Sequence, residues 1–201
     1  MKAEIISIDD IKEDLPGYSP KKAEAFHSQS AKLADQLFDV RLRNSDLTKV
    51  ILLCGGSASG KTEYLHTFLE GEPAIIYDGT LSSVKGVEVK LRNINRAKKE
   101  VDVHAVIPTD LKRAFAAFLN RDRQFSDEVF YRTHSGARQA LSWIARAHPD
   151  VGIKVVESYY KIGSNEVFFD ELIFNNRARQ VEYLEGIQYT ESQILGKVVD
   201  D

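Results

Sequence analysis

Residue types that act on phosphate groups occur at a fixed spacing in residues 55–62. The segment reads GGSASGKT: Gly55 and Gly60 lie five positions apart, and Lys61 and Thr62 follow directly. Glycines let the backbone turn tightly enough to aim successive N–H groups at an anion, and a helix starting there adds its positive dipole end. A lysine and a hydroxyl at these positions reach phosphate oxygens and Mg²⁺. The segment therefore matches the Walker A pattern G-x-x-x-x-G-K-[ST] without a mismatch.

The flanking sequence contains the elements that this pattern requires. The apolar run 50–53 predicts a buried strand, and TEYLHTFLE (62–70) predicts a helix. A glycine-rich turn without a ligand is the alternative, but a chance match in a chain of this length has a probability of roughly 1% or less. We expect Lys61 to act in catalysis as well as in binding, and Thr62 to hold Mg²⁺. The residues expected to bind ATP are Gly55, Gly56, Ser57, Ala58, Ser59, Gly60, Lys61 and Thr62.

Carboxylates follow two further apolar segments. Asp78 comes after the run 74–77, where it could hold Mg²⁺ or bind a substrate; the alternative is an aspartate that caps the next helix or opens a turn. Asp9 and Asp10 follow a short expected strand, and a carboxylate there can accept the proton of an attacking hydroxyl. Neighbouring residues at a strand end point to opposite sides, so at most one of the two faces a cleft. A solvated loop or a helix cap is the alternative for both.

Basic residues gather after the fourth expected strand. Arg121 and Arg123 lie in the polar stretch NRDRQFSDE, with Lys112 and Arg113 nearby. In phosphoryl transfer, cations on a lid neutralise the charge that spreads over the transferred phosphate and exclude water. We predict a lid at about 120–134 in which Arg121 and Arg123 act in catalysis. A solvated helix end is the alternative, as for most runs of charge.

A long amphipathic helix is predicted from Pro20 to about Asn44, with Ser19 as its N-cap. His27 lies near the edge of its apolar stripe and is either packed, solvated or part of a substrate pocket. The expected stripe consists of Phe26, Leu33, Leu37 and Val40.

Strands and helices alternate along the chain, which is typical of a parallel sheet covered on both faces. We predict one P-loop-type domain over residues 1–201, a three-layer α/β/α sandwich with a mainly parallel five-stranded sheet, and a C-terminal extension at about 163–201. Ligands of such sheets bind at the carboxyl ends of the strands. Asp9, the glycine-rich loop, Asp78 and Pro108 should therefore line one cleft. The expected strands are 3–8, 50–53, 74–80, 101–108 and 152–160, and the expected helices are 20–44, 62–70, 82–99, 110–118, 129–147 and 178–195. EVFF (166–169) is a candidate for an additional small strand.

Composition limits the classes of protein that fit. The 201 residues carry a net charge of −3 with a pI near 6.0, which disfavours a nucleic-acid partner, and no stretch is apolar for long enough to span a membrane. The lone cysteine, Cys54, excludes an internal disulfide and is expected to be buried. Because acids stand where a signal peptide needs an apolar run, a cytoplasmic location is expected.

The sequence resembles the zeta-toxin family of P-loop kinases. SIDDIKEDLPGY is similar to the family's D-x-D-x-[IF]-K-x-x-[LH]-P segment, which places Asp9 at its catalytic aspartate and Lys12 at its basic partner. GGSASGKT matches the family's Walker A loop. IIYDGTLSSV resembles a strand that ends in acid-Gly-Thr-Leu, so the resemblance implies that Asp78 and Thr80 bind the substrate.

The resemblance continues into the expected lid and covers most of residues 4–160. RDRQFSDEVFYRTH looks like the family's lid, with Arg123 at the position of its arginine and Arg121 as a second. Members of the toxin type phosphorylate the 3′-hydroxyl of UDP-N-acetylglucosamine with ATP and Mg²⁺. The resemblance therefore implies ATP and Mg²⁺ as cofactors, a small-molecule hydroxyl acceptor and an antitoxin-like protein as a partner.

The chain departs from the family in two respects. In the family the Walker strand precedes the aspartate segment, whereas here Asp9 precedes Gly55, so the motif order is circularly permuted. A parallel sheet accommodates this if the first strand lies beside the third, giving the order first, third, second, fourth, fifth. The other departure is Gln29, which stands where family members often carry a substrate-binding glutamate.

Three functions are consistent with these residues. The first is a kinase that phosphorylates a hydroxyl of a small molecule. The second is a polynucleotide 5′-hydroxyl kinase, which needs a basic groove that the acidic pI disfavours. The third is a nucleotide-dependent switch without transfer, in which replacing Asp9 leaves the output intact.

Overall fold

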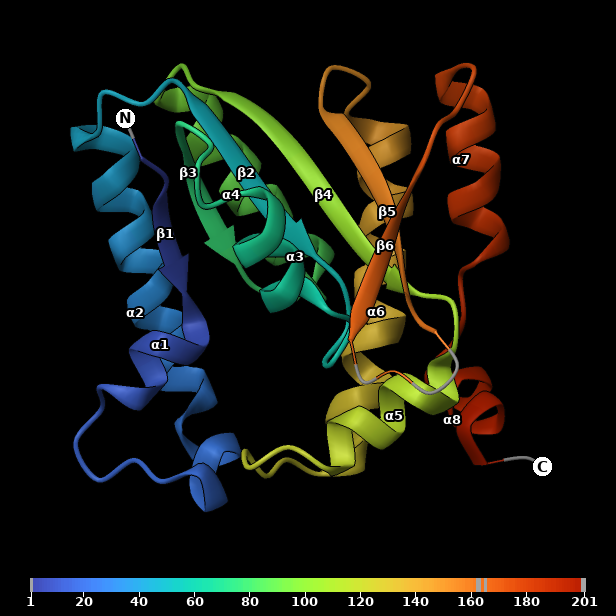
Figure 1. The fold of residues 1–201 in the computed structure, drawn as a ribbon. Helices are drawn as coiled ribbons and strands as arrows, with labels where there is room; N and C mark the ends of the chain where they lie inside the picture. The colour runs from blue at the N-terminus through green and yellow to red at the C-terminus, as the bar shows by residue number, and fades with distance from the viewer. Residues whose placement is uncertain (1, 162–163, 165, 200–201) are drawn as a thin grey trace.

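The computed structural model describes residues 2–161, 164 and 166–199. Within them the chain forms a mixed α/β fold with one six-stranded sheet and eight α-helices (Figure 1). The strands are β1 (Glu4–Ser7), β2 (Lys49–Cys54), β3 (Ala74–Asp78), β4 (Glu100–Pro108), β5 (Gly152–Tyr160) and β6 (Val167–Leu172). The helices are α1 (Ile8–Glu13), α2 (Ala23–Asn44), α3 (Lys61–Phe68), α4 (Val84–Arg96), α5 (Leu111–Leu119), α6 (Asp127–Ala147), α7 (Arg177–Gly186) and α8 (Glu191–Val199), with a 3₁₀ helix η1 at Pro20–Lys22.

The strands of the sheet lie in the order β1-β3-β2-β4-β5-β6. The first five are parallel to one another and have the spatial order predicted from the sequence. The predicted count of five strands is wrong, because β6 joins the same sheet antiparallel to β5. It pairs from Val155 opposite Leu172 to Tyr160 opposite Val167, and so hydrogen-bonds an edge that would otherwise be unpaired.

Helices cover the two faces of the sheet unequally. The larger core lies on the face of α2, α4, α6 and α7, whereas a smaller core lies under α3 (Figure 1). β2 shows the sequence origin of this arrangement, because Val50 and Leu52 belong to the larger core while Ile51 and Leu53 belong to the smaller one. A strand buried on both faces is apolar throughout. Cys54 is fully buried at the end of β2, as expected.

The chain after β5 packs largely around α6. A third core joins α5, the first turns of α6 and α8, with Phe118, Phe130 and Ile194 among its buried residues. The single helix predicted over 178–195 is in fact two, α7 and α8. The predicted C-terminal extension contains β6, α7 and α8, and its residues 163, 165, 200 and 201 lie outside the described part. None of the described helices is both long and apolar enough to cross a membrane.

Helix α2 begins later and packs on a different face than predicted. Pro20–Lys22 is a separate 3₁₀ turn, and Ser19 makes no side-chain cap bond to it. Leu33 and Val40 of the expected apolar stripe are 37% and 40% exposed. The stripe was misplaced because two of the four residues in the buried row, which lie four positions apart, are small rather than large and apolar. That row consists of Ser30, Ala34, Phe38 and Leu42.

A short helix replaces the loop expected after β1. The Ser7 side chain accepts a hydrogen bond from the Asp10 N–H and so caps α1 at its start. The side chains of Asp9 and Lys12 are therefore one helical turn apart, and their positions follow helical rather than strand geometry.

Candidate active site

A cavity of about 330 Å³ lies at the carboxyl ends of β1, β2 and β3. Gly55 and Gly56 are buried at the start of the loop, and Pro108 faces a much smaller cavity beside Ser59 and Gly60. Pro108 is therefore not part of the predicted cleft. The predicted site residues that line the larger cavity are Asp9, Lys12, Ser57, Ala58, Ser59, Gly60, Lys61, Thr62, Asp78, Thr80, Arg121 and Arg123.

The glycine-rich loop, residues 55–60, has a conformation that requires glycine at two positions. Gly60 has φ = +88°, a left-handed conformation that favours glycine, and α3 begins at the next residue. At Gly56 a Cβ atom would lie 2.3 Å from the ring of His134, so a larger residue has no room. The backbone turn at Gly60 and the close packing at Gly56 each require glycine, whether or not a ligand is bound.

Lys61 lies at the junction of the loop and α3. Its Nζ donates hydrogen bonds to the carbonyl oxygens of Gly55 and Gly56 at 3.0 and 2.8 Å, and to Ser59 Oγ at 3.4 Å. Burial lowers the pKa of Lys61, while the nearby Asp78 carboxylate acts in the opposite direction. Because the first N–H groups of a helix have no partner within it, the start of α3 adds backbone donors to this end of the cavity.

Helix α6 holds the tip of the loop at Ser57. The Ser57 N–H donates to Thr133 Oγ1 at 3.0 Å, and the Ser57 carbonyl oxygen lies 2.9 Å from His134 Nε2. Arg138 Nη1, which can only donate, lies 3.1 Å from His134 Nδ1. Nδ1 is therefore the acceptor, and Nε2 carries the proton donated to Ser57. Burial lowers the pKa of His134 well below its ordinary value, so the ring is neutral.

Sequence reasoning included Thr133 and His134 in the expected lid but did not identify them as contacts of the glycine-rich loop. Residues 127–134 of the expected lid belong to α6, and within them Thr133 and His134 are buried rather than mobile. The available signal was the spacing of His134 and Arg138, four positions apart on a helix, directly after a basic segment. It indicates that the two side chains meet, but not which loop they contact.

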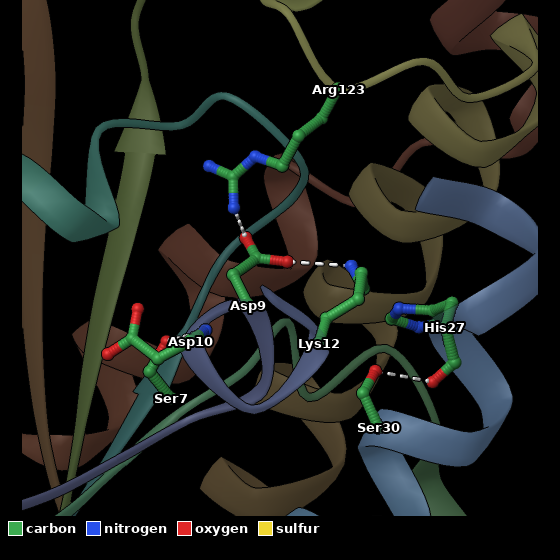
Figure 2. Close-up of polar contacts among 7 residues, drawn as sticks. All are labelled: Ser7, Asp9, Asp10, Lys12, His27, Ser30 and Arg123. Carbon is green, nitrogen blue, oxygen red and sulfur yellow. Dashed lines mark hydrogen bonds and ion pairs between the residues drawn. The ribbon is translucent and has the colours of Figure 1, made fainter. Parts of the chain in front are cut away.

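Asp9 lines the same cavity as the glycine-rich loop and forms ion pairs with two cations (Figure 2). Its Oδ1 lies 2.7 Å from Lys12 Nζ and its Oδ2 lies 2.6 Å from Arg123 Nη1. Lys12 is fully buried, whereas the Asp9 side chain is 42% exposed. Burial by itself would raise the pKa of Asp9, but the charges of Lys12 and Arg123 outweigh it and hold the pKa below 3.8. Asp10 points away from this group in Figure 2, so only one of the two acids faces the cavity.

Arg121 lies between two aromatic rings. Its guanidinium carbon is 4.2 Å from the ring centre of Phe118 and 5.2 Å from that of Phe125. Burial, followed by repulsion from Arg123, lowers the pKa of Arg121 to about 10, so it stays charged at neutral pH. Within the described residues Arg121 has no ion pair, and its buried Nε has no hydrogen-bond partner. His27 and Arg132 also line the cavity.

Asp78 and Thr80 complete the cavity wall at the end of β3. Burial raises the pKa of Asp78 to about 6, although Lys61 acts to lower it. Thr80 Oγ1 lies 3.1 Å from Ser82 Oγ, and the Thr80 carbonyl oxygen accepts from the Gly55 N–H. The described part of the chain contains no group of three His, Cys, Asp or Glu side chains arranged to hold a metal ion. Thr62 and Asp78 nevertheless put a hydroxyl and a carboxylate oxygen on one cavity, which fits the few protein ligands that Mg²⁺ uses beside phosphates.

The charges of the cavity are arranged in two parts. One part has Lys61 and the glycine-rich loop, whose backbone donors suit a polyphosphate. The other has the ionised Asp9 between Lys12 and Arg123, with Arg121 beside it. An anion held in the first part would share the cavity with a carboxylate that can accept a hydrogen bond from a hydroxyl.

Comparisons with known proteins identify no family for this chain. No model of a protein family matches it, and no curated protein matches it. Among solved structures it is similar to the crystal structure of the AvrRxo1-ORF1:ORF2 complex in its native form. The two are 13% identical, the match covers 85% of this chain and 78% of that one, and the TM-score is 0.47. A similarity of this size does not establish a shared function.

Proposed function

We propose that this protein is an ATP-dependent phosphotransferase that moves the γ-phosphate to a hydroxyl of a small molecule. The observation that carries the proposal is a single cavity lined by Lys61 and the glycine-rich loop as well as by Asp9, Arg121 and Arg123. The pattern G-x-x-x-x-G-K-[ST], followed by a helix, accounts for the first part as an ATP phosphate site. A nucleotide sugar such as UDP-N-acetylglucosamine is the proposed acceptor, and this rests on the resemblance to zeta toxins.

In the proposed reaction the loop N–H groups and Lys61 hold the β- and γ-phosphates. Thr62 and Asp78 provide oxygen ligands for Mg²⁺, which when bound neutralises charge on the phosphates. Arg121 has no carboxylate partner among the described residues, and we assign it to the charge that develops on the transferred group.

Asp9 orients the attacking hydroxyl in this proposal. A carboxylate with a lowered pKa is a weak base, but phosphoryl transfer through a loose transition state needs positioning and charge neutralisation more than an early proton transfer. Both Asp9 oxygens hold cations, so an acceptor hydroxyl would share the carboxylate with Lys12 or take the place of Arg123. Thr80 and Lys12 would contact the acceptor.

The test is to incubate the purified protein with ATP, Mg²⁺ and a panel of nucleotide sugars and to measure product masses. A product one phosphate heavier, lost in Asp9→Asn and Lys61→Ala, is expected. Asp10→Asn is the matched control, because Asp10 lies on the same helix but faces away from the cavity. If ATP binds but no panel member gains a phosphate and Asp9→Asn changes nothing, the nucleotide-sugar proposal fails and a nucleotide-dependent switch becomes the better account.

An antitoxin-like protein is a further proposal from the resemblance alone. It predicts that a protein partner that covers the cavity of this chain abolishes phosphate transfer. Co-expressing this chain with a candidate antitoxin-like protein and repeating the mass assay on the complex tests this.

A further inference from the structure

The segment that joins α5 to α6, residues 120–126, carries three side chains that line the cavity. We call it the arginine loop; the three side chains are Arg121, Arg123 and Phe125. Its position therefore determines where the two guanidinium groups lie relative to Asp9. The question is what holds the loop in this position.

Hydrogen bonds attach the arginine loop to the start of α2. The Gln124 N–H donates to the carbonyl oxygen of Pro20 at 2.9 Å. The Ser126 N–H donates to Glu24 Oε2 at 2.7 Å, and the Ser126 hydroxyl donates to Glu24 Oε1 at 3.2 Å. One carboxylate of α2 thus accepts both donors of the residue that precedes α6, 102 positions further along the chain.

Side chains of the arginine loop also contact the segment before and at the start of α2. Arg123 pairs with Asp9 on α1, Phe125 lies under Lys12 Nζ at 4.8 Å, and the rings of Phe125 and His27 are 6.1 Å apart. The arginine loop therefore lies against the segment 9–27, which carries Asp9 and Lys12. Glu24 does not line the cavity, so it cannot contact a ligand there.

We propose that Glu24 is a positioning residue that holds the arginine loop over the cavity. Its carboxylate holds the loop at Ser126, three residues beyond Arg123, while the ion pair of Arg123 with Asp9 holds the loop at the cavity. The second attachment is lost when an acceptor hydroxyl takes the place of Arg123 at Asp9. Glu24 is then what keeps Arg121 and Arg123 near the transferred phosphate. The kinetic consequence rests on the proposed phosphotransferase function, whereas the attachment itself does not.

Trypsin tests the attachment without any enzymatic activity, since it cleaves after Arg121 and Arg123 when the loop opens. The full-length protein and Glu24→Ala are digested briefly and the fragments are identified by mass. Cleavage at these two bonds should become about tenfold faster in Glu24→Ala, because two hydrogen bonds to a charged acceptor are lost at an exposed site. Glu88→Ala, which removes an exposed glutamate paired with Arg92 on α4, is the matched control and should change nothing.

A kinetic measurement separates positioning from a merely structural role. Glu24→Ala should lower kcat about tenfold with the KM for ATP unchanged, since Glu24 acts on the loop and not on the nucleotide site. Glu24→Gln keeps one acceptor oxygen, so its kcat should lie between that of Glu24→Ala and that of the unaltered protein. Unchanged cleavage after Arg121 and Arg123 in Glu24→Ala would overturn the proposal. This holds even if the melting temperature of the variant is lower, because a lower melting temperature with unchanged cleavage and kcat indicates a merely structural role. Faster cleavage in a protein that phosphorylates nothing would support the attachment while refuting the proposed function.

Discussion

Replacing Asp78 with asparagine is expected to stabilise the fold at neutral and alkaline pH. Burial raises the pKa of Asp78 from 3.8 to about 6. A carboxyl with a higher pKa in the folded protein than in the unfolded chain binds its proton more tightly when folded. The free energy of unfolding therefore falls as the pH rises from below 3.8 to above 6. Asparagine has nearly the same shape without the charge, so it avoids this loss.

The size of the effect follows from the pKa rise. A rise of about 2.2, at about 1.4 kcal/mol for each pKa unit, corresponds to about 3 kcal/mol at pH 8 and about half of that at pH 5. The difference in stability between Asp78→Asn and the unaltered protein should therefore grow by about 1.4 kcal/mol between these two pH values. Attraction to Lys61 is already contained in the pKa and does not add to it.

Urea unfolding of both proteins at pH 5, 6.5 and 8 measures this difference. Asp46→Asn, at an exposed position outside the cavity, is the control and should show no such trend. A difference that is the same at all three pH values, or larger at pH 5, would refute the conclusion that burial of a charged Asp78 costs stability. If Asp78 serves the proposed reaction, the more stable variant should also be the less active one.

Substitutions at three further positions test other parts of the structure. Gly56→Ala should weaken ATP binding and destabilise the fold by about 1–3 kcal/mol, since its methyl group meets the His134 ring; calorimetry and urea unfolding measure the two effects. Arg138→Met should lower ATP affinity more than Arg138→Lys, because only the lysine can still donate to His134 Nδ1 and preserve its tautomer; a titration comparing both variants decides this. Tyr77→Phe should cost about 1 kcal/mol in unfolding, through the lost bond to Asp35, and leave nucleotide affinity unchanged.

Local signals predicted most of the elements. Helix α5 begins one residue after its predicted start at Asp110, whose carboxylate accepts from the Arg113 N–H. Strands β2 to β5 lie within a residue or two of the predicted strands. Hydrophobic period and capping residues act over a few positions, so the sequence displays them directly. The strand order was predicted through the resemblance to zeta toxins, because the permuted motif order preserves that family's sheet if the first strand lies beside the third, as β1 does.

The sequence did not predict which face of α2 is buried or that a short helix follows β1. The buried face of α2 contains the small residues Ser30 and Ala34 beside Phe38 and Leu42, and counting only large apolar side chains placed that face on the wrong side of the helix. The helix after β1 was missed because six residues with two adjacent acids resemble a polar loop; Ser7 decides the matter by capping α1. Such short elements depend on a neighbouring surface more than on intrinsic propensity.

The sequence by itself determined the strand, glycine-rich loop and helix around Lys61, the α/β class and the acids at the ends of the first and third strands. Only the tertiary structure decided which groups surround them. Asp9 lies between Lys12 and Arg123, α6 holds Ser57 from 76 residues away, and Glu24 holds Ser126 from 102 residues away. Contacts between segments so far apart depend on how the helices pack on the sheet, which no local pattern of residues records.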